Sequence, residues 1–157
     1  MLITGTVVPM VTPTTGRDGT VDEHSLTRYT EHLVSNGVHG LFPCGSIGEF
    51  SSLTHTQRQQ VIETVVDASG QTSVLAGCGD TSVAAVKQHI QTAADAGADA
   101  AVVVTPYYLA TTQKGLTDFY VDVAEVADLP IILYNIPALT GENLDIETVI
   151  ELSEISN

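Results

Sequence analysis

Residues 100–104 read Ala-Ala-Val-Val-Val, a run without any charged or polar side chain. A short apolar run that is rich in β-branched residues is typical of a strand buried on both faces of a parallel sheet. Runs of this kind recur about every 30 residues, which is the length of one βα unit. The others are Val7–Val11, Gly40–Pro43, Val74–Gly77 and Ile131–Tyr134.

Amphipathic segments with recognisable ends lie between these runs. Thr20 and Glu23 have the spacing of a capping box, which marks the start of a helix, and Thr54 and Gln57 repeat that spacing. Glycines that follow the apolar pattern are expected to end three helices in the left-handed conformation. The helices are expected through Leu26, Tyr29 and Leu33, through Val61, Ile62, Val65 and Val66, over Lys114–Ala127 and over Ile146–Ser153, and the predicted stops are Gly37, Gly70 and Gly97.

Strand and helix alternate five times, which predicts an α/β fold with a parallel sheet. No linker interrupts the pattern, so we expect residues 1–157 to form a single domain. A (β/α)8 barrel needs eight such units, usually in ~250 residues, and this chain would then cover about the first five. An open doubly wound sheet also fits five strands, but it favours a glycine-rich phosphate turn where this chain has Thr12–Gly16.

The chain of 157 residues has 19 acidic and 5 basic side chains, a formal net charge of −14. Such a surface repels phosphate backbones, so we expect no nucleic-acid partner. Evenly spread acids in a lysine-poor chain are typical of adaptation to high salt, although an acidic enzyme from ordinary salt has the same pattern. With no run of ~20 apolar residues and no secretory signal at Met1–Gly5, we expect a cytoplasmic protein without a membrane partner.

The cysteines and histidines form no recognisable metal motif. Cys44 and Cys78 do not form a CxxC pair, and the five histidines never show a ligand spacing such as HxxxH. We therefore expect no metal and no other cofactor. We interpret the two cysteines as small buried residues rather than nucleophiles.

Functional groups of parallel α/β folds gather at the carboxyl ends of the strands. After the run Gly40–Pro43 comes the segment Gly45–Phe50, which reads Gly-Ser-Ile-Gly-Glu-Phe. Glycines on either side of Ser46 allow backbone N–H groups to converge on an anion, and the hydroxyl adds a further donor. The alternative is a tight turn that needs glycine for its geometry alone.

Tyrosines follow two other runs. Tyr107 and Tyr108 come shortly after residues 100–104, where they would line a pocket, reach a neighbouring chain, or only pack at the rim. Tyr134 ends the run Ile131–Tyr134. A phenol there can relay protons if hydrogen bonds lower its pKa from about 10, and otherwise it is an aromatic wall of the pocket.

Taken together, these segments resemble the dihydrodipicolinate synthase and N-acetylneuraminate lyase family, the pyruvate-dependent class I aldolases. The resemblance extends over essentially the whole chain. It implies a (β/α)8 barrel, a homotetramer, and a lysine that condenses with pyruvate or another 2-oxo acid to form a Schiff base. The protonated imine withdraws electrons, so a neighbouring carbon–carbon bond can be made or broken. The matching segments are Gly5–Thr6 to Thr12–Pro13, Gly45–Glu49, Ala76–Gly77, Thr105–Tyr108, Leu133–Pro137 and Thr140–Gly141.

The resemblance also implies which residues act on the substrate. The substrate carboxylate would be held by Ser46 and by the glycine turn, which comprises Gly45, Ser46, Ile47 and Gly48. Tyr134 would shuttle protons at the reacting centre, and Tyr108 would complete the relay from an adjacent subunit.

Two departures from the family bear on the substrate. Leu139 stands where dihydrodipicolinate synthase has an arginine that binds the carboxylate of the second substrate, and Ile47 replaces a hydroxyl residue. Loss of a bidentate carboxylate partner weakens recognition of a dicarboxylate. We therefore expect a carbon–carbon lyase that cleaves a 2-keto-3-deoxy sugar acid, such as 2-keto-3-deoxygluconate, to pyruvate and an aldehyde. The alternative is an enzyme similar to 4-hydroxy-tetrahydrodipicolinate synthase.

The family's Schiff-base lysine is expected beyond Asn157, because Lys87 and Lys114 fall in predicted helical segments. These residues thus include the predicted carboxylate site and proton relay but not the amine, so we expect the chain alone to be inactive. Two other hypotheses remain. One is a non-catalytic homologue that pairs with another chain through its open strand edges, and the other is an open-sheet module that binds a nucleotide or phosphate.

Overall fold

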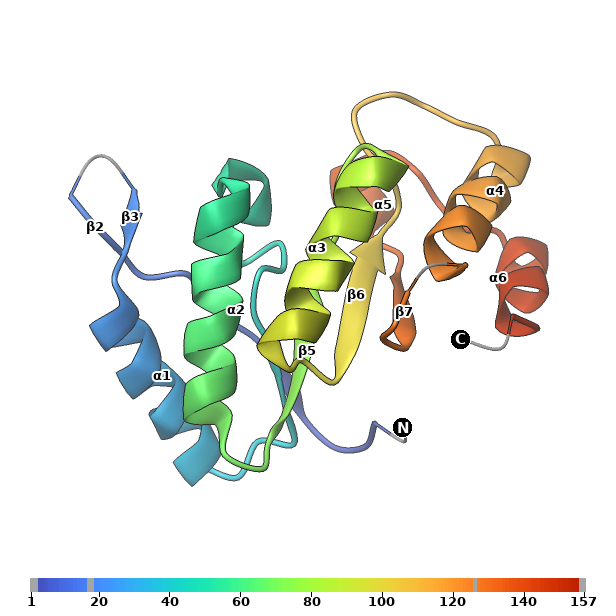
Figure 1. Ribbon diagram of the computed structural model, residues 1–157. Coiled ribbons are helices and arrows are strands. Elements are labelled where there is room, and N and C mark those ends of the chain that lie inside the picture. The colour runs from blue at the N-terminus through green and yellow to red at the C-terminus, as the bar shows by residue number, and fades with distance from the viewer. Residues whose placement is uncertain (1–2, 17–18, 126, 156–157) are drawn as a thin grey trace.

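The strands of the main sheet lie side by side in the order in which they occur in the chain. The computed structural model describes residues 3–16, 19–125 and 127–155. Neighbouring strands pair in parallel, so their carboxyl ends meet at one edge of the sheet (Figure 1). The strands are β1 (Val7–Pro9), β4 (Gly40–Phe42), β5 (Ser73–Gly77), β6 (Ala100–Val104) and β7 (Ile131–Tyr134). They confirm the five predicted runs, except that β1 ends at Pro9 and Val11 is exposed.

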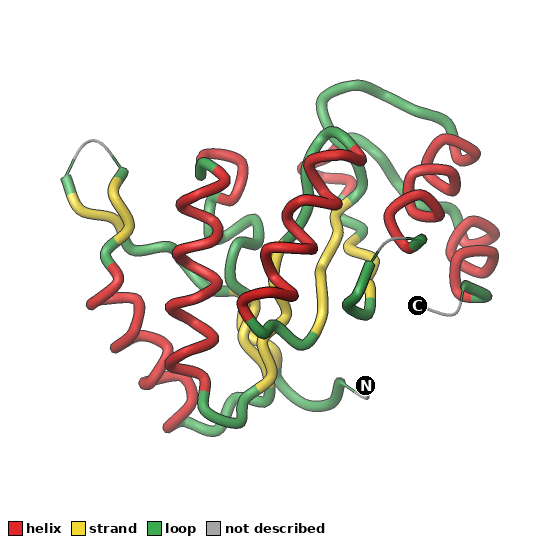
Figure 2. The backbone as a smooth tube through the Cα atoms, viewed as in Figure 1, coloured by secondary structure: helices red, strands yellow, loops and turns green. Residues whose placement is uncertain are grey.

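This sequential strand order distinguishes between the two architectures that the sequence left open. A doubly wound sheet reverses its strand order and carries helices on both faces. Here neighbouring helices pack against one another in chain order and form a single layer beside the sheet (Figures 1 and 2). The arrangement is that of the first five units of a (β/α)8 barrel, so the doubly wound alternative, with its nucleotide-binding module, is wrong. The helices are α1 (Glu23–Ser35), α2 (His55–Ser69), α3 (Val83–Ala96), α4 (Gln113–Ala124) and α6 (Ile146–Ser153).

The core lies mainly between the sheet and the helices. Its largest side chains with less than 2% exposure include Leu26, Leu41, Ile62 and Leu116. A second, smaller cluster lies on the concave face of the sheet and consists of Leu75, Ala100 and Val102, with Val7, Phe42, Ile132 and Tyr134 packed against it. β6 is buried on both faces as predicted, whereas β7 is only half-buried. Tyr134 therefore remains accessible at the end of its strand.

The predicted helix ends are largely confirmed. In the capping box at the start of α2, the Thr54 hydroxyl accepts from Gln57 N at 3.3 Å, and Gln57 Oε1 accepts from Thr54 N at 2.8 Å. Each of the three predicted glycine stops has a positive φ, which glycine adopts without a Cβ clash. These angles are +76° at Gly37, +61° at Gly70 and +89° at Gly97. Gly97 is in the predicted left-handed helical conformation, whereas the ψ of −109° places Gly70 outside it.

The capping box predicted for the first helix is wrong. Thr20 belongs to a short hairpin, β2 (Thr14–Thr15) paired antiparallel with β3 (Thr20–Val21), which the sequence analysis missed. Asp22 caps α1 instead, and its Oδ1 accepts from Ser25 N at 3.0 Å. That backbone hydrogen bond stabilises the carboxylate and lowers the pKa of Asp22.

The remaining differences concern short elements near the strand ends. The structure adds a 3-10 turn, η1 (Phe50–Ser52), and a single-turn helix, α5 (Pro137–Thr140). The helix expected over Lys114–Ala127 begins one residue earlier and ends at Ala124, and residue 126 lies outside the described part of the chain. Within that part, no helix is long and apolar enough to cross a membrane. That residues 1–157 form a single domain stays a prediction.

The packing of α1 on the sheet gives a stability prediction. Leu26 is 0% exposed, whereas Leu109 on the loop after β6 is 75% exposed. We expect Leu26→Ala to lower the free energy of unfolding by about 2–5 kcal/mol, because it removes apolar contacts and leaves a cavity. The matched control Leu109→Ala is expected to change it by less than about 0.5 kcal/mol. Urea denaturation measures both, and equal losses would contradict the described packing.

Candidate functional site

The loop after β4 is shaped to present backbone N–H groups. Cys44 and Glu49 have φ of +55° and +54°, in the left-handed region that non-glycine residues seldom adopt. The loop closes with Glu49 N donating to Ser46 O at 3.2 Å and Phe50 N donating to Gly45 O at 3.4 Å. Within the described chain, the amides of residues 46–48 donate to no protein acceptor. They are available for an anion.

Close backbone contacts explain why glycine is needed here. A Cβ on Gly48 would lie 2.9 Å from Met10 O, and a Cβ on Gly77 would overlap the Cys44 carbonyl. Thr12 Oγ1 also donates to Gly48 O at 2.8 Å, which ties the loop to the segment after β1. Glycine thus allows three neighbouring strand ends to approach one another.

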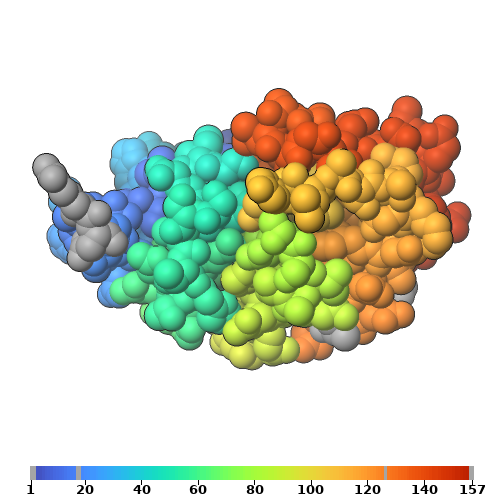
Figure 3. Space-filling model, turned by 90° about the horizontal axis from the view of Figure 1, so that it is seen from above, coloured from blue at the N-terminus to red at the C-terminus, as the bar shows by residue number. Residues whose placement is uncertain are grey.

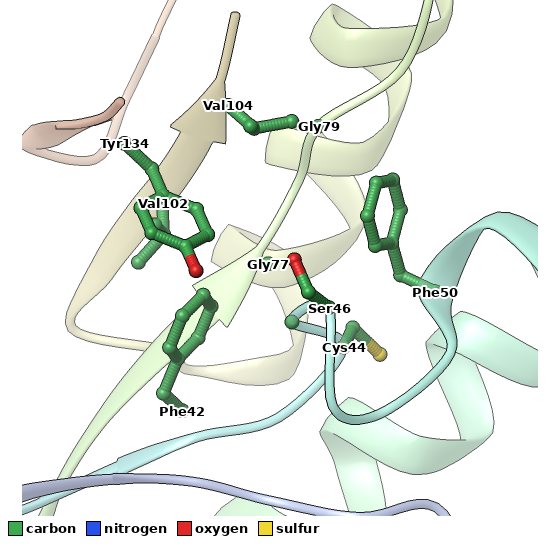
Figure 4. Close-up of a pocket in the computed structure, with 10 residues that line it drawn as sticks. Phe42, Cys44, Ser46, Phe50, Gly77, Gly79, Val102, Val104 and Tyr134 are labelled. Carbon is green, nitrogen blue, oxygen red and sulfur yellow. The ribbon is translucent and has the colours of Figure 1, made fainter. Parts of the chain in front are cut away.

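Ser46 and Tyr134 line the same pocket, at the carboxyl ends of the strands. The ring of Phe42 packs edge-to-face against Tyr134, with centroids 5.8 Å apart. The two hydroxyls turn toward the space between Phe42 and Gly77 (Figure 4). The complete lining is Phe42, Cys44, Gly45, Ser46, Phe50, Gly77, Gly79, Val102, Val104 and Tyr134.

A second, larger pocket adjoins the first, and the two share Ser46, Phe50 and Val104. Leu139 from α5 and Tyr107 from the loop after β6 also line it. Seen from the carboxyl ends of the strands, the segments after β4 (cyan), β6 (yellow-orange) and β7 (red-orange) meet here (Figure 3). The structure therefore brings Gly45, Ser46, Tyr134 and Leu139 together.

Three other candidate residues lie apart from these two pockets. Tyr108 is 91% exposed and has a φ of +79°. The tyrosine that lines the larger pocket is its neighbour Tyr107. The Ile47 side chain is 56% exposed. Gly48 lines a polar groove on the other side of its loop. Any contribution of Ile47 or Gly48 at the pocket is thus through the backbone.

A buried polar network behind the larger pocket was missed by the sequence analysis. Arg58 on α2 is 4% exposed, its Nη1 donates to Gly79 O at 2.8 Å, and its Nη2 lies 3.4 Å from Asp80 Oδ2. The same carboxylate oxygen lies 3.1 Å from His89 Nε2, and His89 Nδ1 lies 3.2 Å from His55 Nδ1. The signal was present, because Arg58 occupies the apolar face of α2 three residues before Val61.

This network has defined charge states. Burial is the main cause that lowers the pKa of His89, and the Arg58 charge adds to it. His89 is therefore neutral, which makes its Nε2–H a donor to Asp80 and its Nδ1 an acceptor from His55. Burial opposes ionisation of Asp80, but the Thr81 amide, His89 and Arg58 outweigh it and lower the pKa of the carboxyl.

Neither cysteine has the surroundings of a nucleophile. Cys44 and Cys78 are both buried as predicted. Burial raises the pKa of Cys44 to about 12 and also raises that of Cys78, so both are thiols at neutral pH. Among the described residues, no group of three or more His, Cys, Asp or Glu side chains could hold a metal ion.

The family model and the curated relatives that match this chain indicate the same family. Residues 2–157 match the dihydrodipicolinate synthetase family. A 4-hydroxy-tetrahydrodipicolinate synthase from Methanothermobacter thermautotrophicus is 42% identical over 156 residues, which are 99% of this chain and 55% of that protein.

Solved structures agree with this match. The chloride-inhibited dihydrodipicolinate synthase of Acinetobacter baumannii, complexed with pyruvate, is 38% identical with a TM-score of 0.95 over 99% of this chain and 54% of that one. YagE, a prophage protein of E. coli K12 from the same family and also in complex with pyruvate, is 36% identical with a TM-score of 0.93 over 98% and 52%. The chain thus spans about half the length of the relatives it matches.

The burial of His89 beside the Arg58 charge predicts a loss of stability in acid. The lowered pKa of His89 means that, below about pH 6.5, the unfolded chain binds a proton that the folded protein excludes. The lowered pKa of Asp80 adds a further loss in stronger acid, below its ordinary pKa of 3.8. We expect the melting temperature to fall between pH 7.5 and about 5, and His89→Gln to reduce that fall. His24→Gln, at an exposed position of α1, is the control. An unchanged pH profile in His89→Gln would contradict this assignment.

Proposed function

We propose a function from one premise: the chain belongs to the dihydrodipicolinate synthetase family. The chain supplies the carboxylate site and proton relay of a pyruvate-dependent Schiff-base enzyme that makes or breaks a carbon–carbon bond. The observation that carries this proposal is the shared pocket of Ser46 and Tyr134, beside the unpaired amides of residues 46–48. Pyruvate complexes of two relatives with the same fold support it.

Each group at the pocket has a distinct task in this chemistry. The amides of the glycine turn and the Ser46 hydroxyl bind the carboxylate of the 2-oxo acid, because N–H and O–H donors gain most from an anionic acceptor. The Tyr134 hydroxyl, which faces the same space, exchanges a proton with the reacting centre. Positioning of the substrate between fixed donors reduces the entropic part of the barrier.

The amine of the Schiff base is proposed to come from polypeptide outside residues 1–157. Lys114 lies on α4, where its Nζ pairs with Asp118 at 2.9 Å, and Lys87 lies on α3. Both are on helices, away from the strand ends that line the pocket. Relatives about twice as long as this chain leave room for the missing residue.

Two reactions are candidates for the function of this site. The names of the curated relatives favour formation of 4-hydroxy-tetrahydrodipicolinate, so this is our first candidate. The second is cleavage of a 2-keto-3-deoxy sugar acid such as 2-keto-3-deoxygluconate. Leu139 favours the second candidate, because this apolar side chain at the larger pocket offers no partner for a second carboxylate.

The exposure of Tyr108 supports association of several subunits as part of the proposed function. Its 91% exposed side chain does not line either of the two pockets described above, so it would complete the relay of another subunit in a homo-oligomer, expected to be a tetramer. The mass of the full-length protein in solution tests this, and a monomer would contradict it.

Imine trapping tests the chemistry directly. In the full-length protein, we expect borohydride with pyruvate to add one reduced pyruvate to a lysine beyond Asn157, as measured by intact and peptide mass. Ser46→Ala should raise the pyruvate concentration for half-maximal trapping by about 10- to 100-fold, because a hydrogen bond to a charged group is lost. Tyr134→Phe should lower turnover by about 10²- to 10⁴-fold while trapping persists.

Matched controls are available on α1. Ser35→Ala and Tyr29→Phe make the same chemical changes far from the pocket and should leave both readings unchanged. Absence of a pyruvate adduct in the wild type would overturn the proposed function.

The substitution Leu139→Arg decides between the two substrates. If the site can form 4-hydroxy-tetrahydrodipicolinate, an arginine at the larger pocket should raise kcat/KM for that reaction by about tenfold or more, because it adds a bidentate carboxylate partner. Cleavage of 2-keto-3-deoxygluconate should not gain. Wild-type activity on the sugar acid alone would make the second candidate the function, and activity on neither would reject both.

A further inference from the structure

The charged side chain of Arg58 is only 4% exposed, which is unusual for an arginine. It shares the core-facing side of α2 with Val61 and Val65, and its Nε has no partner within the described chain. A buried cation costs free energy unless every donor is paired, so packing alone would favour an apolar residue here. An arginine at this position calls for another explanation.

The Arg58 guanidinium begins a stack that reaches the larger pocket. Its Cζ lies 5.1 Å from the centre of the Phe50 ring, and that ring packs edge-to-face on Tyr107 with centroids 5.8 Å apart. Phe50 and Tyr107 both line the pocket that contains Ser46. Burial, and then the Asp80 charge, raise the pKa of the Tyr107 phenol, and Arg58 opposes them.

The same guanidinium holds a second loop. Through Gly79 O and Asp80 it contacts the segment after β5, while the stack reaches the segments after β4 and β6. Three of the strand-end loops are thus connected by one side chain from α2.

The residue after Tyr107 is in a conformation that needs support. Tyr108 has a φ of +79°, a conformation that is unfavourable for a non-glycine residue and persists only when its surroundings enforce it. Its own side chain is 91% exposed and contributes little packing. The restraint therefore acts through its neighbours, and Tyr107 is the one that is packed.

We propose that Arg58 is a positioning residue, which fixes Tyr107 through Phe50 and so sets the direction in which Tyr108 projects from its subunit. The inference rests on the proposed function, in which Tyr108 completes the proton relay of an adjacent subunit. Arginine suits this task because its planar guanidinium stacks on an aromatic ring while it donates in fixed directions. Lysine provides the same charge, but it has neither a planar group that stacks on a ring nor several donors in fixed directions.

Kinetics of the full-length protein separate positioning from binding. Arg58→Met and Arg58→Lys are expected to lower kcat by roughly tenfold or more, because a small misplacement of a relay group is costly. The pyruvate dependence of imine trapping should stay within about threefold of the wild type, because the Arg58 guanidinium reaches the loop around Ser46 through the Phe50 ring. The contact of Cys44 Sγ at 3.9 Å is to the Arg58 backbone carbonyl, which both variants keep. Arg28→Met, at an exposed position of α1, is the matched control.

A double substitution tests the connection to Tyr108. Tyr108→Phe should lower kcat, and Arg58→Lys added to it should lower kcat little further, because both act on one relay. Multiplicative losses would overturn the proposal, as would wild-type kcat in Arg58→Lys. Full rescue by Arg58→Lys of a defect seen in Arg58→Met would indicate only a structural charge and would also overturn it.

An independent readout distinguishes failure of this inference from failure of the proposed function. If the wild type forms no pyruvate adduct, the proposed function is wrong, and nuclear Overhauser contacts between the Phe50 and Tyr107 rings still decide whether Arg58 positions them. Loss of those contacts in Arg58→Lys, with the buried Tyr120 signals unchanged, supports positioning. Contacts that persist unchanged overturn it.

Discussion

The parallel pairing of five strands in chain order determines where the loops, the helices and the candidate site can lie. Because β1, β4, β5, β6 and β7 run in one direction, every strand delivers its following loop to the same edge of the sheet. Because consecutive strands are neighbours, their connecting helices form one layer and leave the concave face free for a small second cluster. The candidate site follows from this geometry, since its residues are remote in sequence but come from adjacent strand ends.

The strand ends can approach closely only because particular side chains are absent or well placed. Gly48 and Gly77 have no Cβ where the backbone of a neighbouring segment passes, which makes the turn around Ser46 compact. Arg58 is instead a long side chain that connects two loops, because its guanidinium donates to Gly79 O and stacks on the Phe50 ring. Substitutions at these positions would affect the site without touching a substrate.

Elements that depend on local patterns could be predicted from the sequence, whereas those that depend on long-range contacts could not. The apolar runs, the Thr54 capping box and the left-handed glycines are local, and the structure contains them. The hairpin that includes Thr20 was missed because its pairing competes with the capping spacing. At the site, Ser46 and Tyr134 follow from strand ends. The packing of Tyr107 and Arg58 depends on loops that meet only in three dimensions.

We propose that the Ser46 turn and Tyr134 form one 2-oxo acid site, and a crystal structure of the full-length protein grown with pyruvate would show whether they do. We expect the pyruvate carboxylate within hydrogen-bond distance of the amides of residues 46–48, and the second carbon beside the Tyr134 hydroxyl. Pyruvate bound elsewhere, or a pocket that stays empty at saturating pyruvate, would show that these groups do not form the site.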